Sequence, residues 1–199
     1  MLERRIATAR RPRRGDAAEA SELRLLALVE SGDKHALAQL YRAYFPRLAR
    51  FLDRMTRNAG LIEEIINDTL LVVWQKADTF NHSSRVSTWI FAIAYRKALT
   101  ALRSLDEPVD ADPDAIAGND SMEPDIVLSL QQLQYNVAQA LDALSHVQRT
   151  VVNLAYYHGM GYDEIAVIMD CPVNTVKTRM FTARSRLREI LAGQMENVS

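Results

Sequence analysis

Cysteine is almost absent from this sequence. Cys171 is the only one, which excludes an internal disulfide and a cysteine-rich metal site. The four histidines also fall at no spacing typical of metal ligands; they are His35, His82, His146 and His158. We therefore expect no metal and no other cofactor, and we interpret Cys171 as a small buried hydrophobic residue.

Glycine and proline are scarce, with 7 and 6 residues in a chain of 199. Alternating β-type runs are also few, and this balance favours helices. No stretch approaches the roughly 20 apolar residues that span a bilayer. The Arg-rich N-terminus lacks the apolar segment of a secretory signal. These absences predict an all-α, cytoplasmic protein that does not insert into a membrane.

The net charge of −1 conceals a segregated pattern of charges. Basic side chains gather in residues 4–14, 79–105 and 177–188, whereas residues 106–125 are acidic and contain no base. Such blocks indicate nucleic-acid surfaces separated by an acidic linker, although charge runs can also be plain solvated faces. For the first cluster we favour the plainer interpretation, a disordered basic tail over residues 1–18.

Residues 19–104 read as a four-helix domain of ordinary size. Hydrophobic periodicity predicts its helices, at 19–30, 34–57, 61–77 and 86–103. The second helix keeps its apolar stripe in phase across Pro46, so we expect a kink there and not a break. The third helix is apolar over most of its circumference, which is typical of a helix that is central in a core or docked to a partner. Gly60 is expected to separate these two helices.

A linker and a second helical domain follow. Residues 105–125 are rich in Asp, Pro, Ala and Gly, so they cannot bury enough apolar surface to fold and should form a flexible acidic linker. The second domain covers residues 126–194. Within it, Ser145 and Gln148 match a capping box that starts a helix to residue 157, and Gly159 suits a left-handed helix end.

The stretch 162–184 carries the pattern of a helix-turn-helix. Ala166 is small enough for close helix crossing, and Pro172 suits the first position of the second helix. Val176 and Met180 should face the core, which leaves a polar and basic face outward. In a helix-turn-helix this face of the second helix enters the major groove. An ordinary three-helix core with a basic surface is the weaker alternative.

These residues resemble a known family. The stretch 161–184, with Ile-Ala-Val-Ile-Met-Asp-Cys-Pro-Val-Asn-Thr-Val-Lys-Thr-Arg, is similar to region 4 of extracytoplasmic-function (ECF) sigma factors of the sigma-70 family. Residues 64–77, followed by Phe80, Thr88-Trp89-Ile90 and Arg96-Lys97, resemble their region 2. The similarity covers residues 22–192. It implies a non-enzymatic DNA-binding subunit of bacterial RNA polymerase, composed of two helical domains joined by the acidic linker.

The resemblance also implies partners and sites. The partners are the beta-prime and beta subunits of core polymerase, promoter DNA and an anti-sigma factor. The core-binding face on the third helix comprises Glu64, Asp68, Leu71, Val72 and Gln75. The −10 element would be read, and its melted strand held, by Phe80, Asn81, His82, Ser83, Ser84, Arg85, Arg96 and Lys97. At the −35 element, Arg179 and Arg184 would hold phosphates, and Asn174 could cap the helix, contact DNA or simply be tolerated. The residues near bases or the thymine methyl would be Thr175, Lys177, Thr178, Phe181 and Thr182.

Two positions depart from the family pattern, and one aromatic residue has two interpretations. Asn67-Asp68 stands where the family often has Gln-Glu, and Asn174 stands where Gly is common. Trp89 is interpreted as a core residue in preference to a stacking platform.

Three other functions explain less of the chain. A stand-alone helix-turn-helix regulator accounts for residues 162–184 but not for the apolar third helix. A sigma mimic that only sequesters an anti-sigma factor need not keep Lys177, Arg179 and Arg184 outward. An enzyme is least expected, because no nucleophile–base pair or phosphate-binding glycine loop is visible.

Overall fold

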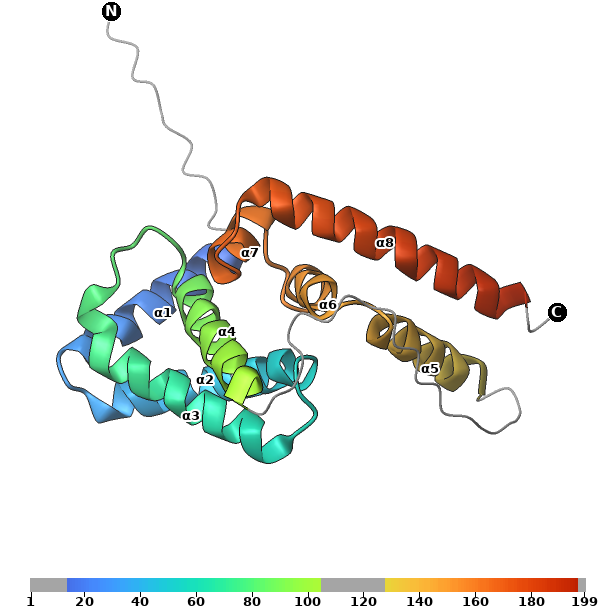
Figure 1. Ribbon diagram of the computed structural model, residues 1–199. Coiled ribbons are helices and arrows are strands. Elements are labelled where there is room, and N and C mark those ends of the chain that lie inside the picture. The colour runs from blue at the N-terminus through green and yellow to red at the C-terminus, as the bar shows by residue number, and fades with distance from the viewer. Residues whose placement is uncertain (1–13, 105–127, 197–199) are drawn as a thin grey trace, which may run out of the picture.

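The computed structural model describes residues 14–104 and 128–196, and throughout these ranges the regular elements are helices. The N-terminal unit consists of α1 (Arg14–Glu30), α2 (Lys34–Asp53), α3 (Ala59–Lys76), the 3-10 helix η1 (Ala77–Thr79) and α4 (Val86–Ser104) (Figure 1). The C-terminal unit consists of α5 (Leu128–Asp142), α6 (His146–Val152), the π-helix η2 (Asn153–Tyr157), α7 (Tyr162–Ile168) and α8 (Val173–Glu196). The all-α prediction is confirmed. The expected linker and most of the basic tail lie outside the described residues.

The four helices of the N-terminal unit enclose one hydrophobic core. The predicted stripe of α2 is buried, with Leu40, Tyr44 and Leu48 fully inaccessible to solvent. It meets Ile66 of α3 and Phe91 of α4, which are also fully buried. α2 continues as one helix across Pro46, as predicted.

Three helix boundaries of the N-terminal unit differ from the predicted ones by two residues or more. α1 begins at Arg14, inside the segment expected to be a tail, and α2 ends at Asp53 instead of residue 57. Gly60 does not separate α2 from α3 but lies in the first turn of α3. The reason is the side chain of Asn58, whose Oδ1 accepts a hydrogen bond from Leu61 N at 3.1 Å and so caps the helix earlier.

The helix start and the helix end that were predicted in the C-terminal unit are both present. Ser145 and Gln148 form the expected capping box at the start of α6. Gly159 has φ +64°, the predicted left-handed conformation. The helix that was expected to run as one α-helix to residue 157 instead changes to a π-helix from Asn153.

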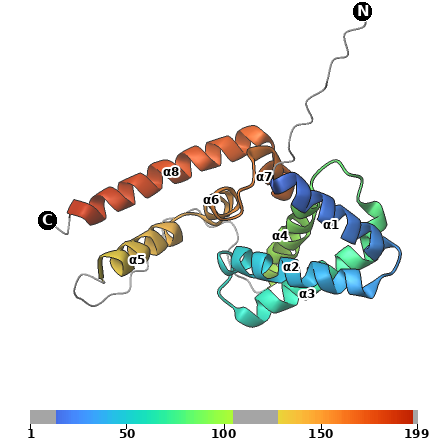
Figure 2. The ribbon, with the colours of Figure 1, turned by 180° about the vertical axis from the view of Figure 1, so that it is seen from behind.

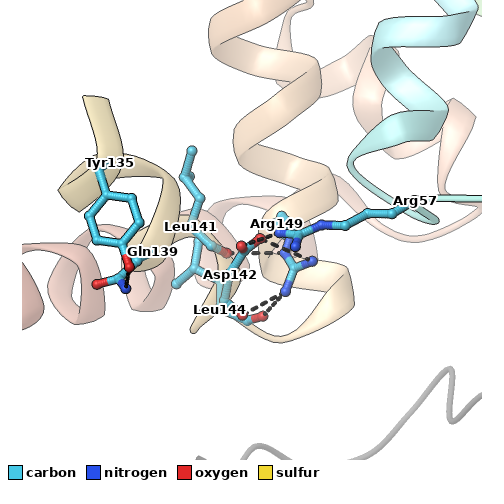
Figure 3. A network of polar contacts seen from close by, with 7 residues as sticks. All are labelled: Arg57, Tyr135, Gln139, Leu141, Asp142, Leu144 and Arg149. Atoms are coloured by element: carbon cyan, nitrogen blue, oxygen red, sulfur yellow. Dashed lines mark hydrogen bonds and ion pairs between the residues drawn. The ribbon is translucent and has the colours of Figure 1, made fainter. Parts of the chain in front are cut away.

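Arg149 holds the end of α5 against the start of α6 (Figure 3). Its guanidinium donates to the carbonyl oxygens of Leu141, Asp142 and Leu144 at 3.0, 2.6 and 3.2 Å. Leu141 and Asp142 end α5, where carbonyls lack partners within the helix, and Leu144 lies in the turn before α6. Burial lowers the pKa of Arg149 from its ordinary value, and the Asp142 carboxylate opposes that shift.

The two units pack directly on each other. α7 lies against α4 (Figures 1 and 2), and the buried hydrophobic residues of both units form one continuous cluster. α8 extends away from this contact, beside α6 and α5. Among the helices of residues 14–104 and 128–196, none is both long and apolar enough to cross a membrane.

Candidate nucleic-acid interface

α7, the turn after it and α8 form a helix-turn-helix. Asp170 in the turn has φ +49°, and Cys171 N donates to Ala166 O at 3.1 Å, which reverses the chain tightly. The small side chain of Ala166 leaves room for this approach. Pro172 precedes the first helical residue by one position, and its carbonyl accepts Thr175 N at 2.9 Å. The predicted motif is therefore present, with Pro172 outside α8 and not at its first position.

The inner side of α8 is buried as predicted. Val176 is 0% exposed and Met180 is 1% exposed, and Ala183 continues the same face. This packing fixes the rotation of α8 about its own axis. The opposite face is accessible to solvent, and Phe181 is its most exposed large hydrophobic side chain at 74%.

Six of the eight predicted −35 residues are exposed, whereas Thr175 and Arg179 are half-buried. The hydroxyls of Thr178 and Thr182 donate to the carbonyls of Asn174 and Thr178 at 3.0 and 3.1 Å. Their hydroxyl protons are therefore engaged within the helix, and what they offer a partner is mainly methyl surface. The exposed residues are Asn174, Lys177, Thr178, Phe181, Thr182 and Arg184. Methyl and aromatic groups between cations suit thymine methyls and phosphates.

The loop of residues 80–85 has its own internal structure. Asn81 Oδ1 accepts hydrogen bonds from Ser83 N at 3.1 Å and from Ser83 Oγ at 2.6 Å. His82 adopts φ +57° and is exposed, and its ring lies edge-on to Phe80, with centroids 4.9 Å apart. Phe80 is only 8% exposed and packs on Trp89. The ring of Phe80 thus packs between the loop and Trp89, and it exposes little surface on which a base could stack.

A groove of about 470 Å³ lies between α3 and α4. Its walls combine apolar surface with basic and hydroxyl groups: they are Val72, Lys76, Thr79, Trp89, Ile93, Arg96, Lys97 and Thr100. Trp89 is half-buried, so it contributes both to the core and to the groove. Sequence reasoning did not find Lys76, Thr79 and Thr100, because the groove arises from the crossing of two helices that no local pattern reports.

The predicted core-binding residues share one face of α3 by helical spacing. Glu64, Leu71 and Gln75 are exposed, and Leu71 is 51% exposed although it is a large hydrophobic side chain. Asp68 and Val72 are half-buried at the edge of this face towards α4.

Two residues that were assigned to different partners meet at that edge. Lys97 Nζ lies 2.9 Å from Asp68 Oδ2 and donates a hydrogen bond to it. The pair joins the predicted core-binding face of α3 to the basic groove beside α4. In this arrangement the charge of Lys97 is partly neutralised by Asp68.

Two predicted DNA-binding arginines also have partners within the chain. Arg85 Nε lies 3.9 Å from Glu164 Oε1 of α7. Arg184 Nε donates to Tyr156 Oη at 3.1 Å, and its guanidinium lies over the same ring. Sequence reasoning missed Glu164 and Tyr156 as partners, because both contacts join residues far apart in the chain.

Cys171 is half-buried in the turn, and Arg179 Nη1 lies 3.6 Å from its sulfur. Over the described part of the chain, no group of three His, Cys, Asp or Glu side chains is arranged to hold a metal ion. The two helical surfaces offer cations, methyl groups and aromatic rings, which are groups that contact phosphates, thymine methyls and bases in nucleic-acid complexes.

Both units match family models. The model "Sigma-70 region 2" matches residues 40–107, and "Sigma-70, region 4" matches residues 134–187. Among curated proteins, the chain is 31% identical over 166 residues to the ECF RNA polymerase sigma factor RpoE of Cereibacter sphaeroides, which covers 82% of this chain and 90% of that protein. It is 28% identical over 173 residues to the ECF RNA polymerase sigma-E factor of Escherichia coli K12, with the same coverage.

Solved structures with the same fold include CnrH, in complex with the cytosolic domain of CnrY, with a TM-score of 0.64 and 21% identity over 87% of this chain and 98% of that chain. A second is the sigma factor RpoE of Bartonella quintana, crystallised with the anti-sigma factor NepR. Its TM-score is 0.58, with 27% identity over 78% of this chain and 96% of that chain.

Proposed function

Because this chain belongs to the extracytoplasmic-function sigma factors of the sigma-70 family, and so directs RNA polymerase core to promoter DNA, we propose which of its surfaces binds each partner. Sigma factors are initiation factors without catalysis of their own, so the core supplies the chemistry. We infer that the protein acts in the bacterial cytoplasm, where that core is found.

The face of α3 around Leu71 binds the beta-prime subunit. The support for this assignment is that Leu71 is 51% exposed, on a helix whose other side is already buried in the core. Glu64 and Gln75 flank it and are exposed. A protein that buried this leucine would remove apolar surface from water, while the flanking polar groups would fix its register.

The loop of residues 80–85 and the groove between α3 and α4 hold the melted −10 strand. A base leaves the stack only if a pocket replaces its stacking and hydrogen bonds. His82 and Trp89 offer ring surface, and Arg96 and Lys97 lie where they can hold phosphates of a strand that enters the groove. Phe80 acts by shaping the loop.

The outer face of α8 reads the −35 element in duplex DNA. Lys177 and Arg184 are exposed for phosphates or base edges, and Phe181 with the methyl groups of Thr178 and Thr182 suits thymine methyls. This assignment rests on the rotation of α8 that Val176 and Met180 fix by their burial.

An anti-sigma factor controls this chain, by analogy with the Bartonella quintana sigma factor that was crystallised with NepR. The surfaces that face core polymerase and DNA are the ones such a partner has to cover. On the proposed polymerase contact, Leu71 is the exposed apolar side chain that such a partner would bury.

One observation carries these assignments: a single chain presents an exposed basic face on α8 and, on its other unit, a basic groove beside an exposed leucine. Run-off transcription with core polymerase on fragmented genomic DNA tests them. The chain should give discrete start sites, Leu71→Ala should weaken transcription from all of them, and Phe181→Ala should change their relative strengths. If the chain adds no start sites beyond those of the core alone, the assignments are wrong.

A further inference from the structure

The loop of residues 80–85, which we assign to the −10 strand, leads directly into α4. Arg85 is the last residue before that helix, and its carbonyl accepts a hydrogen bond from Trp89 N at 3.1 Å. Arg85 therefore occupies the N-cap position, where a side-chain oxygen commonly accepts a backbone N–H of the first turn. A guanidinium has no acceptor, so the side chain of Arg85 cannot cap α4.

The cap comes from α1. Glu19 Oε1 accepts a hydrogen bond from Val86 N at 3.0 Å, although the two residues lie 67 positions apart in the chain. Val86 is the first residue of α4 and is fully buried, and its N–H belongs to the first turn, where no acceptor is available within the helix. A carboxylate at this end of a helix is also favoured by the helix dipole. Glu19 thus provides the acceptor that Arg85 lacks.

Glu19 lies on the buried side of α1. Leu23 and Leu26 follow it on the same side of the helix by helical spacing. Leu26 is 3% exposed, and Leu23 is partly buried against the hydrophobic core. Glu19 is half-buried at the end of this apolar side, where a carboxylate needs a hydrogen-bond partner. The packing of α1 therefore holds the carboxylate of Glu19 at the start of α4.

α1 also contacts the other end of the loop. It packs on α4 (Figures 1 and 2) and on η1, which ends at Thr79. Phe80 N donates to Ala77 O of η1 at 3.2 Å, so the loop begins on an element that α1 contacts. Both ends of the loop of residues 80–85 are therefore attached to elements that pack on α1.

We propose that Glu19 is a positioning residue for the −10 reader: by capping α4 it fixes the loop of residues 80–85, with His82 and Arg85, in the conformation that receives the melted strand. Glu19 lies before residues 40–107, which match region 2, so it adds to the reader from outside that stretch. An uncapped first turn opens more often, and only the fraction in which it is formed binds the strand. This inference rests on the proposed function for its consequence, but the cap itself can be tested without DNA.

Hydrogen–deuterium exchange of the free chain tests the cap. Glu19→Ala should speed exchange at the amides of residues 83–88 by about twofold to thirtyfold, the range that loss of a helix cap gives. Glu19→Gln should exchange close to the parent rate, because an amide oxygen still accepts a hydrogen bond. Glu22→Ala is the matched control, and it should leave these amides at the parent rate. It removes another half-buried carboxylate of α1, whose partner at 3.1 Å is Arg47 of α2.

Glu164 also contacts the first turn of α4, from the C-terminal unit. Its Oε1 accepts a hydrogen bond from Thr88 Oγ1 at 3.0 Å. The effect of Glu19→Ala on exchange should therefore be measured in a Glu164→Ala background as well. It should be at least as large there, because Glu19 bonds to the backbone of α4 independently of Glu164. An effect that vanishes in this background would contradict a direct cap by Glu19.

The consequence for DNA is measured with core polymerase bound, on a promoter found by run-off transcription. Glu19→Ala should reduce strand opening by about threefold or more, because fewer chains present a formed loop. Its affinity for core polymerase should stay within about twofold of the parent, because Glu19 lies outside the Leu71 face of α3. Glu19→Gln should restore opening, and Glu22→Ala should open the promoter as the parent does.

Failure of the cap and failure of the proposed function give different results. If Glu19→Ala exchanges as the parent does at residues 83–88, or if Glu22→Ala speeds exchange equally, the proposed cap is overturned. If exchange rises but promoter opening does not change, Glu19 does not position the reader. If the unmodified chain opens no promoter, the proposed function fails, while the exchange rates still decide whether Glu19 caps α4.

Discussion

Lys97 and Asp68 form an ion pair between α4 and α3, with Nζ 2.9 Å from Oδ2. Both side chains keep substantial solvent access, at 38% and 49%, so the pair contributes at most about 1 kcal/mol to stability. Its location matters more than its strength, because it lies where the proposed polymerase face borders the proposed DNA groove.

Asp68→Ala should therefore weaken binding to core polymerase while leaving the fold intact. We expect a severalfold loss of affinity in a titration of labelled chain with core, and a change in unfolding free energy below about 1 kcal/mol. Glu63→Ala is the control, since Glu63 is exposed on α3 but is rotated away from the Leu71 face. Equal affinities of the two variants would remove Asp68 from the contact.

Met180 and Phe181 are adjacent in sequence but face opposite ways, at 1% and 74% exposure. Met180→Ala should lower the free energy of unfolding by about 2–5 kcal/mol, because it opens a cavity in the core. Phe181→Ala should change it by no more than about 0.5 kcal/mol. Urea denaturation measures both, and similar losses would mean that the rotation assigned to α8 is wrong.

Lys177→Ala should weaken binding of the holoenzyme to all promoters to a similar degree. Loss of one phosphate contact should also reduce the slope of log affinity against log salt concentration by about 1. Anisotropy measurements over a series of salt concentrations would show it, with Lys34→Ala as a control on a distant exposed lysine. An unchanged salt dependence would exclude a phosphate contact at Lys177.

His158 makes the packing between the two units sensitive to acid, because its ring lies against those of Phe51 and Phe91. Burial, followed by the nearby charges of Arg47 and Arg50, lowers the pKa of His158 to about 4 from its ordinary 6.5. A lowered histidine pKa means that the folded form with neutral His158 is favoured above about pH 6.5 and loses this advantage as pH falls from there through about 4.

Thermal unfolding between pH 7 and pH 4 should therefore show a fall in stability that is smaller in His158→Gln. His35→Gln, on the exposed surface of α2, should behave as the parent protein does. If the His158→Gln protein loses stability as steeply as the parent, His158 is not buried between the two units.

Much of this fold could be predicted from sequence because its signals are local. The period of apolar residues located most helices, the Ser145–Gln148 pair located a helix start, and Gly159 located a helix end. The start of α3 was misplaced because Asn58 caps the helix, and the period of apolar residues does not report that cap. The period of apolar residues did not distinguish the π-helix from Asn153 from a continued α-helix; there Asn153 Nδ2 donates to Phe51 O of the other unit.

The residues of the candidate sites also divide into those with a local sequence signal and those without one. The outward face of α8 followed from helical spacing and from the burial of Val176 and Met180. By contrast, the groove beside Trp89 and the partnership of Glu164 with Thr88 depend on how helices cross, so sequence reasoning missed them. Phe80 was expected at the DNA surface, yet its ring lies mostly under His82 and Trp89.

The most direct test of the account is the permanganate reactivity of thymines in promoter DNA, which reports unpaired bases. With core polymerase and this chain together, thymines near the −10 element should become reactive, and either component alone should leave them protected. Substituting Arg96 and Lys97 by alanine should reduce that reactivity while core binding persists. Protected thymines in the complete mixture would contradict the claim that this chain opens promoter DNA for a bound polymerase.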